Sequence, residues 1–395
     1  MTRVVLDDRV RRYDRGRVLV GPAGRIVRLT GAGVAALDAQ AAGAASPLGR
    51  RLIDAGLAHP LPARTERVDA TIVVPVRDRA EALDRCLVAA AGGDGAHVLV
   101  VDDGSRDPGA IAAVCARHGA RLLRREASGG PAAARNHALA QVSSRLVAFL
   151  DSDCVPPPGW IGDLAGHFED ARVAAVAPRV LDPALDMGSR PAAVAPGTRV
   201  SYVPSAALIV RRAALGGGFD PSLRYGEDVD LVWRLHDAGW RVRYDPRVVV
   251  AHGEPARSLA LRRYRYGTSA APLSRRHPGR LAPFVLDPVP ATVLALLAAR
   301  RPRAAAAVLA VQTALLARRL HALRVPVRLA PLYTVRAVAH TAQGILRGHP
   351  AYRAGVVAGA LRHRTAAPLT PQLKLALPAA IRSAPRRWRS NSGSE

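Results

Sequence analysis

Four aspartates follow two apolar runs of this sequence, at positions where a metal ion could bind. Asp102 and Asp103 come directly after "HVLVV", and Asp151 and Asp153 follow "RLVAFL" as an Asp-x-Asp pair. Carboxylate oxygens suit Mg²⁺ or Mn²⁺, especially a cation that shares its coordination with a diphosphate. Most single Asp-x-Asp pairs are solvated turns. Four acids at one sheet edge, however, repel one another unless a cation or a hydrogen-bonding ligand is present, so we interpret these residues as a metal and diphosphate site.

Other residue types, before and between these acids in the sequence, suit nucleotide binding. Pro75 and Arg77 end the run "ATIVVPVR", and Gly129 and Gly130 precede a helical pattern that carries Arg135. The glycines would let the chain pass close to a nucleotide, with Arg135 projecting toward its ribose or phosphates. The same stretch is also compatible with an ordinary loop and helix N-terminus.

A second acidic pair, Glu227 and Asp228, begins an amphipathic helical pattern after a glycine-rich stretch. Asp228 could help to cap that helix, or it could be a general base above a sugar-binding cleft. His252 ends the run "RVVVAH". A lone histidine is usually structural, but at a strand end it could reach the same metal or diphosphate.

The elements that must position these residues alternate between strands and helices. From residue 70 to 153, runs of Val, Ile and Leu are each followed by a turn and a helical pattern. Near-continuous apolar strands are typical of a parallel sheet covered on both faces. The sequence therefore predicts a doubly wound α/β domain, in which ligands bind at the carboxyl ends of the strands.

A separate small module is predicted before this domain, over residues 1–65. "RVLVGPAGRIVRL" contains two β-type runs, and "TGAGVAALDAQAA" and "SPLGRRLIDAGL" have helical patterns. A two-stranded ribbon with two or three helices indicates a winged-helix-like unit, which suits a peptide or DNA, although a purely structural extension fits equally well. "HPLPART" is predicted to link it to the next domain.

Beyond Leu281 the chain becomes basic and apolar. "VPATVLALLAA" and "AAAAVLAVQTALLA" are 11 and 14 residues long, shorter than the ~20 residues of a membrane-spanning helix. They could form buried helices, a hairpin dipping into the bilayer, or helices lying on it. We expect residues 281–380 to form a basic helical region that associates with a membrane, and residues 381–395 to form a disordered tail.

The charge distribution favours an anionic membrane surface over nucleic acid as a partner. From Pro255 onward there are 23 arginines and one lysine against two acids, which accounts for +22 of the formal net charge of +26. This charge lies far from the winged-helix-like module, and only 4% of the residues are aromatic, too few for many base-stacking contacts. Anionic lipid suits such a region, and we expect no nucleic-acid partner.

The N-terminus and the cysteines indicate a cytoplasmic protein. "MTRVVLDDRVRRYDRG" has no apolar core of the kind that a signal peptide needs. Cys86, Cys115 and Cys154 have no metal-ligand spacing and cannot all pair, which favours a reducing compartment. We therefore expect the protein at the inner face of the cell membrane.

Over residues 69–255 the motifs resemble those of the family 2 glycosyltransferases, which have a GT-A fold. They occur in that family's order and spacing: "VVPVRDRAEAL", "VVDDGSRD", "GGPAAARNHAL", "FLDSDCVPPPGWI", "GGFDPSLRYGEDVDLVWRLHDAG" and "VVVAH". The resemblance implies a GT-A sheet, mixed but mostly parallel, over residues 69–280. It also implies an inverting transferase that uses a nucleotide-diphosphate sugar.

Residue roles follow from the same resemblance. It implies that Asp103 lies near the nucleoside, that Asp151 and Asp153 lie at the ribose and the metal, and that Asp228 is the base. We also expect Pro75, Arg77, Asp102, Arg135 and Glu227 to contact substrate, and His252 to reach the metal. The Gln-x-x-Arg-Trp motif of processive synthases is not found in the sequence, so we do not expect long-chain polymerisation.

A narrower resemblance comes from "LVGPAGRIVRLTGAGVAAL" and "LRRYRYGTSAAPLSRRHPGR", which are similar to glycosyltransferases of mycofactocin gene clusters. It implies UDP-glucose as donor, a peptide-derived redox cofactor or its precursor as acceptor, and a β-linked oligosaccharide product. One alternative is a cell-envelope glycosyltransferase that acts on a lipid-linked or polysaccharide acceptor. An alternative of another class is a basic nucleic-acid-binding protein.

Overall fold

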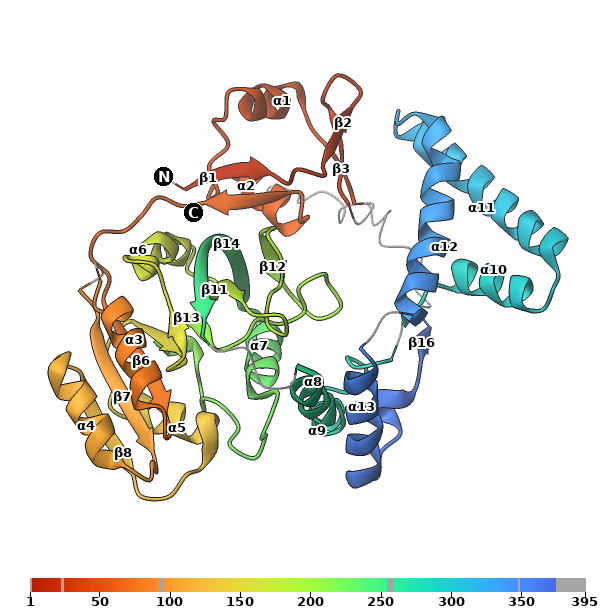
Figure 1. The fold of residues 1–395 in the computed structure, drawn as a ribbon. Coiled ribbons are helices and arrows are strands. Elements are labelled where there is room, and N and C mark those ends of the chain that lie inside the picture. The colour runs from red at the N-terminus through yellow and green to blue at the C-terminus, as the bar shows by residue number, and fades with distance from the viewer. Residues whose placement is uncertain are drawn as a thin grey trace, which may run out of the picture.

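A nine-stranded mixed sheet forms the centre of the protein in this computed structural model, which describes residues 2–22, 25–92, 95–253, 259–283, 285–346 and 349–373 (Figure 1). The strand order is β10-β14-β11-β13-β9-β6-β7-β8, with β12 paired to β14. The strands are β6 (Ala70–Val76), β7 (His97–Asp103), β8 (Arg121–Arg125), β9 (Leu146–Leu150), β10 (Cys154–Val155), β11 (Val173–Leu181), β12 (Ala192–Val194), β13 (Ala207–Arg211) and β14 (Arg241–His252).

Most strands of this sheet run in one direction. β6 pairs in parallel with β7 and β9, β7 with β8, and β11 with β14. β13 is antiparallel to β9 and β11, whereas β10 and β12 are antiparallel to β14. The predicted α/β class with a mixed, mostly parallel sheet is therefore confirmed.

Helices cover both faces of the sheet. On one face, α3 (Ala80–Ala90), α4 (Pro108–Arg117) and α6 (Trp160–Ala165) share an apolar core with the strands. On the other face, α5 (Gly130–Leu139) and α7 (Glu227–Asp237) contribute to a second core. The side chains of β6 alternate between the two, because successive side chains of a strand point to opposite faces: Ile72 and Val74 lie in the first core and Val73 in the second.

A small N-terminal unit lies beside the sheet (Figure 1). It contains β2 (Arg11–Tyr13), β3 (Val18–Val20) and β4 (Ile26–Arg28) in one antiparallel sheet, with α1 (Gly31–Asp38) and α2 (Pro47–Asp54). The side chains of Thr30 and Ser46 cap these helices by accepting from the N–H groups of Gly33 and Gly49.

The prediction that "HPLPART" is a linker was wrong for its first residues, which form a strand. β5 (Ala58–Leu61) pairs in antiparallel register with β1 (Arg3–Leu6), and His59 Nε2 lies 3.1 Å from the buried carboxylate of Asp7. Proline is disfavoured within strands because it lacks an N–H donor. Pro60 is tolerated here because β1 and β5 form a sheet of only two strands, so β5 is an edge strand.

The C-terminal region is helical. It contains α8 (Leu259–Thr268), α9 (Ala270–Arg276), α10 (Pro288–Ala298), α11 (Pro302–Ala322), α12 (Ala330–Leu346) and α13 (Pro350–Arg362), with the short strands β15 (Val285–Leu286) and β16 (Gln372–Leu373) paired in parallel. The first apolar run lies in α10, which ends before Arg300, and the second lies in α11, which begins after it. Among the described residues, no helix combines the length and the hydropathy needed to cross a membrane. The predicted tail, residues 381–395, lies outside the described residues.

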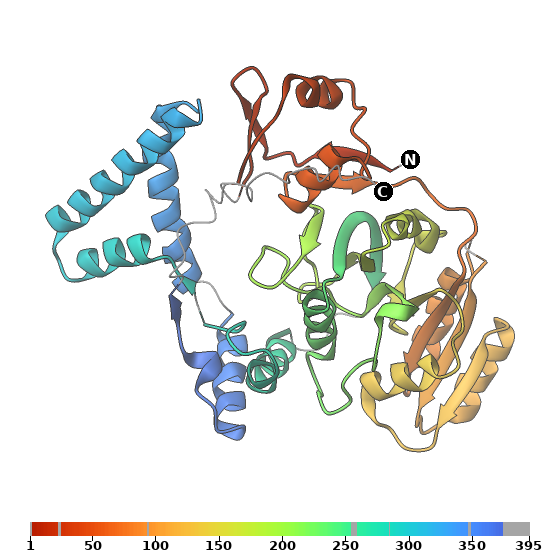
Figure 2. The same cartoon turned by 180° about the vertical axis from the view of Figure 1, so that it is seen from behind.

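Although they are remote in sequence, the N-terminal unit and the C-terminal helices are in contact. Val18 and Val20 of β3 are buried against Leu320, Val325 and Ala330, around the turn from α11 to α12. In both views, α10, α11 and α12 lie on the side of the molecule opposite α4 and β8 (Figures 1 and 2). The domain limits at residues 65, 69, 280 and 380 stay predictions.

Candidate active site

A large cavity of about 1200 Å³ opens at the carboxyl ends of the central strands. Its walls come from the ends of β6 and β9, the starts of α5 and α7, and the helices α8, α9 and α13. The structure brings all but one of the predicted site residues to this cavity: Pro75, Arg77, Asp103, Arg135, Asp151, Asp153, Glu227, Asp228 and His252.

Asp102 is the predicted residue that does not line the cavity. Its side chain is fully buried, where it accepts a 2.9 Å hydrogen bond from the Ser105 N–H and forms an ion pair with Arg124. Adjacent residues of a strand point to opposite faces, so Asp102 and Asp103 cannot both face the same cavity. This corrects the prediction that Asp102 contacts a substrate; it holds the turn after β7 instead.

Asp103 fixes the glycine loop in front of α5. One carboxylate oxygen accepts from the Gly129 N–H at 3.1 Å, and the other accepts from the Gly130 N–H and the Ser128 hydroxyl, both at 2.8 Å. An ion pair with Arg125 balances its charge. In this structure Asp103 therefore shapes the rim of the cavity.

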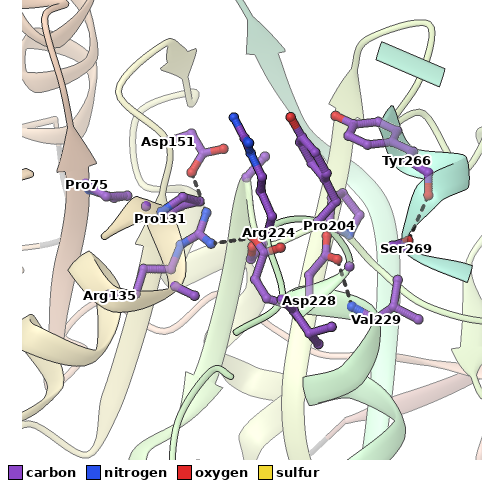
Figure 3. A pocket seen from close by; sticks show the side chains of 18 of the residues that line it. Pro75, Pro131, Arg135, Asp151, Pro204, Arg224, Asp228, Val229, Tyr266 and Ser269 are labelled. Atoms are coloured by element: carbon purple, nitrogen blue, oxygen red, sulfur yellow. Dashed lines mark hydrogen bonds and ion pairs between the residues drawn. The ribbon is translucent and has the colours of Figure 1, made fainter. Parts of the chain in front are cut away.

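Arg135 is the most deeply buried charged group at the cavity. The side chain is 2% exposed, and its guanidinium donates to Asp151 at 2.7 Å and to Glu227 at 3.2 Å (Figure 3). It also lies over the ring of Phe219, 5.2 Å from the ring centroid. Through these two carboxylates Arg135 joins the end of β9 to the start of α7. The expectation that it projects toward a ribose or phosphate stays a prediction.

Asp228 lies at the first turn of α7, facing the cavity. Gly226 precedes this turn with a φ of +84°, and a Cβ there would lie 2.9 Å from the side chain of Leu273, so glycine allows α7 to begin close beneath α9. Burial raises the pKa of Asp228 to about 7, and the neighbouring Glu227 carboxylate adds to the rise. A hydrogen bond of 2.7 Å from the Val229 N–H orients the carboxylate. Such a group can accept a proton near neutral pH.

The pairing of β10 with β14 brings possible metal donors together. It places Cys154 opposite His252, and the donor atoms of Asp153, Cys154 and His252 all lie within 4.8 Å of one another. His252 Nε2 is 3.5 Å from Asp153 Oδ1. Burial raises the pKa of the Cys154 thiol well above its ordinary value, and a soft sulfur ligand suits a hard divalent cation less well than oxygen does.

Asp151 lies outside this group of donors, because its carboxylate is paired with Arg135. The residues that fit a hard divalent cation are therefore Asp153, by its carboxylate, and His252, by its imidazole. Arg79 also contacts Asp153, at 2.5 Å. This smaller set differs from the predicted one, which included Asp151.

Comparison with known families indicates what kind of domain contains this cavity. Residues 71–193, from β6 to β12, match the family model described as glycosyl transferase family 2. This stretch is therefore similar to a family 2 glycosyltransferase domain, and we refer to the α/β unit built on the central sheet as the glycosyltransferase domain. The matched stretch includes Asp103, Asp151 and Asp153, whereas Asp228 and His252 follow it in the sequence.

Two curated relatives and one solved structure show what else this chain is similar to. It is 44% identical over 261 residues to the pre-mycofactocin glycosyltransferase of Mycobacterium tuberculosis, covering 61% of this chain and 55% of the relative. It is 32% identical over 204 residues to the succinoglycan biosynthesis protein ExoU of Rhizobium meliloti, covering 44% of this chain and 59% of that protein. The chain thus spans little more than half the length of either relative.

The solved structure is a mannosyltransferase from Pyrobaculum calidifontis in complex with GDP-Man and Mn²⁺. It matches with a TM-score of 0.50 and 21% identity, over 77% of this chain and 89% of that one. At this identity the likeness concerns the fold alone, and it supports the GT-A architecture expected for the glycosyltransferase domain.

The wall of the cavity farthest from β7 was not predicted from the sequence. It is rich in aromatic and basic side chains, namely Tyr202, Arg224, Tyr225, Arg262, Tyr266 and Tyr352. The rings of Tyr225 and Tyr266 contact each other edge to face, with centroids 6.2 Å apart. Tyr266 lies in the "LRRYRYG" stretch singled out above, whereas no sequence signal indicated that Tyr352 of α13 would reach the glycosyltransferase domain.

Close backbone packing between α8 and α13 holds Tyr352 at this wall. A Cβ at Gly355 would lie 2.0 Å from the carbonyl oxygen of Tyr264, and one at Gly267 would lie 2.2 Å from that of Tyr352. The two helices therefore touch through glycine, in the manner of small-residue helix interfaces. At the other end of this contact, Arg262 of α8 donates two 2.8 Å hydrogen bonds to Asp182 at the end of β11.

Gly355→Ala should lower the stability of the protein and displace the wall of the cavity that contains Tyr352. The added methyl group must push α13 away from α8, and overpacking of this kind costs about 1–3 kcal/mol. Gly344→Ala in α12 is the matched control, because a Cβ there meets nothing within 4 Å and alanine favours a helix by about 1 kcal/mol. Thermal unfolding should show opposite shifts for the two variants; equal shifts would contradict the close contact.

Proposed function

We propose that this protein is an inverting glycosyltransferase that moves glucose from UDP-glucose onto a hydroxyl of a mycofactocin-type, peptide-derived redox cofactor or its precursor. The observation that carries the proposal is Asp228, a carboxyl with a pKa of about 7 facing a 1200 Å³ cavity beside a family 2 domain. The similarity to pre-mycofactocin glycosyltransferase supports the acceptor and hence the expected β-linked oligosaccharide product.

The reaction follows from the positions of the groups. A nucleotide-diphosphate sugar would lie along the side formed by Pro75, Arg77 and the glycine loop, with its anomeric carbon toward Asp228. The acceptor oxygen attacks that carbon as its proton passes to Asp228, and the bond to the departing diphosphate breaks on the opposite face. One displacement inverts the anomeric configuration, so no covalent sugar intermediate on the protein is needed.

Asp153 and His252 would hold a divalent cation, Mg²⁺ or Mn²⁺. Such a cation, when bound, neutralises negative charge on a diphosphate. Arg77 and Arg79 line the same side of the cavity, and their guanidinium groups suit phosphate oxygens. Arg135 stays paired with its two carboxylates and keeps Asp151 in place.

We expect Asp153→Asn to raise the Mn²⁺ concentration required for half-maximal activity by at least tenfold. The variant removes a charged oxygen donor but keeps the shape of the side chain. Cys154→Ala is the matched control, since a soft sulfur ligand suits a hard divalent cation less well than the Asp153 carboxylate does. A metal titration of both variants measures this, and a larger effect at Cys154 than at Asp153 would refute the assignment.

The aromatic wall supports an acceptor that contains a ring. Tyr225, Tyr266 and Tyr352 offer flat apolar surfaces with hydroxyl groups at their edges, which suits stacking on a cyclic, partly polar molecule. Incubation of the purified protein with UDP-glucose and pre-mycofactocin tests this. We expect the acceptor mass to increase by one or more hexose residues. Transfer only to a polyprenyl-linked glycan would instead favour the cell-envelope alternative, to which the similarity to ExoU gives some weight.

The C-terminal helices support a peripheral location at the inner face of the cell membrane. α11 and α12 expose Val311, Leu315 and Val335, and Arg301 and Arg303 are exposed at the start of α11. A helical region that exposes both apolar side chains and arginines suits the headgroup region of an anionic bilayer.

Flotation with vesicles tests this location. We expect the protein to float with phosphatidylglycerol vesicles at low salt and to bind phosphatidylcholine vesicles far less, because arginines contribute about 1 kcal/mol each near an anionic surface. The double variant Val311→Asp, Leu315→Asp should lose binding. Val88→Asp, at an equally exposed valine of α3, should retain it; equal loss in both would argue against a specific surface.

A further inference from the structure

A second, smaller cavity lies where the N-terminal unit meets the glycosyltransferase domain. Its volume is about 270 Å³, and it lies between the end of α2, strand β12 and the turn that joins α7 to β14. Ile53 and Asp54 contribute one wall, and Trp240 and Arg243 contribute another. None of the residues assigned to the transfer reaction lines it.

Arg243 is the unusual group in this cavity. The residue is 5% exposed, and its buried Nε has no hydrogen-bond partner. Within the described part of the chain, its guanidinium forms no ion pair and donates no hydrogen bond. A buried charge without a partner is strongly unfavourable. The cavity has room for a group that could pair with this guanidinium.

The nearby carboxylates are already engaged by another arginine. Arg241, two residues earlier on β14, forms ion pairs with both Asp54 and Asp170. Burial lowers the pKa of Arg243 to about 10, and Arg241 adds to this, so Arg243 still carries its charge at neutral pH. Burial lowers the pKa of His59 of β5, and Arg243 lies close enough to add to this effect. The cavity thus contains a positive charge that the described side chains do not balance.

The turn after α7 does not balance this charge either. The last carbonyl groups of α7 accept hydrogen bonds from the N–H groups of Ala238, Gly239 and Trp240. His236, the other titratable group that lines the cavity besides Asp54 and the two arginines, adds no negative charge in either protonation state.

We propose that this cavity binds a small anion, a carboxylate or a phosphate, through Arg243. Its volume lies below the roughly 300–1,000 Å³ of pockets for drug-sized ligands, so the ligand is a small free anion or the anionic end of a longer molecule. Because α2 and β14 belong to different units, a bound anion would tie the N-terminal unit to the glycosyltransferase domain. The proposal is independent of the sugar donor and acceptor.

Thermal unfolding tests the site without donor or acceptor. The midpoint is measured at pH 7.5 and fixed ionic strength while sodium chloride is replaced by sodium phosphate or by sodium succinate. We expect wild type to gain several degrees with at least one anion, and the anion that acts identifies the phosphate or carboxylate class. Arg243→Met should lose this gain and should have a higher midpoint than wild type in chloride, since it removes an unpaired buried charge at similar volume.

Two further variants separate the cavity from other anion effects. Arg106→Met, at an arginine whose side chain is 88% exposed, should respond to the anions as wild type does. Arg243→Lys keeps the charge and should retain a reduced response. The proposal fails if Arg243→Met gains as many degrees as wild type, or if it is less stable than wild type in chloride while Arg243→Lys is not.

Discussion

Replacing Asp228 by asparagine should reduce sugar transfer by about 10²- to 10⁴-fold, which is the usual contribution of a general base. Asparagine keeps the size of the side chain and can still accept the hydrogen bond from Val229, but it cannot take the proton of an acceptor hydroxyl. Initial rates at saturating donor and acceptor measure the loss. Asp237→Asn, at a half-exposed acid near the end of the same helix, is the control and should stay within about twofold of wild type.

The raised pKa of Asp228 also gives this prediction a pH signature. The base must be ionised to act, so kcat/KM should rise with pH through about 7. Because folding raises this pKa from 3.8 to about 7, the folded protein binds a proton more tightly than the unfolded chain does. The contribution of Asp228 to stability is therefore present below pH 4 and is lost as the pH rises to 7.

Asp228→Asn removes this dependence. The variant should match wild type near pH 4 and unfold several degrees higher than wild type at pH 8, where the ionised carboxylate destabilises the native protein. A variant that retains turnover, or that is less stable than wild type at pH 8, would refute the assignment of Asp228 as a base with a raised pKa.

Arg135→Met should be among the most destabilising single substitutions in the chain. It leaves Asp151 and the buried Glu227 beside each other without their shared cation, and removing one partner of a buried ion pair costs about 3–5 kcal/mol. Urea unfolding gives the free energy. Arg117→Met breaks an exposed pair of similar length, 2.8 Å to Asp84, and should cost far less, because solvent screens an exposed pair.

The loss at Arg135 should be partly recovered by neutralising its partner. If repulsion between the two acids is the cause, Arg135→Met combined with Glu227→Gln should be more stable than Arg135→Met alone. Equal stability of the Arg135→Met and Arg117→Met variants would contradict the structural role given to Arg135.

The core of the glycosyltransferase domain could be predicted from sequence because its signals are local. Buried parallel strands require near-continuous apolar runs, which mark β6, β7 and β9, and the acids that follow them necessarily lie at one sheet edge. The same reasoning failed for Asp102, because two adjacent acids at the end of a strand do not reveal which of them faces the cavity. It also failed at β5, where Pro60 concealed a strand whose partner lies more than fifty residues earlier.

The remaining parts of the site depend on contacts that the sequence does not encode locally. Tyr352 reaches the cavity only because α13 packs against α8 through glycine, and His252 approaches Asp153 only through the pairing of β10 with β14. Arg135 has the residue type expected for a phosphate ligand. Its burial between Asp151 and Glu227 depends on how α5 packs against α7 and β9, which no motif reports.

The anomeric configuration of the product tests the central claim most directly. UDP-glucose carries its glucose in the α configuration, and a single displacement with Asp228 as the base must deliver it as a β-glycoside. The coupling constant of the anomeric proton in the NMR spectrum of the purified product distinguishes the two configurations. We predict a β-linked sugar; an α-linked product would contradict the single-displacement mechanism and the role of Asp228 within it.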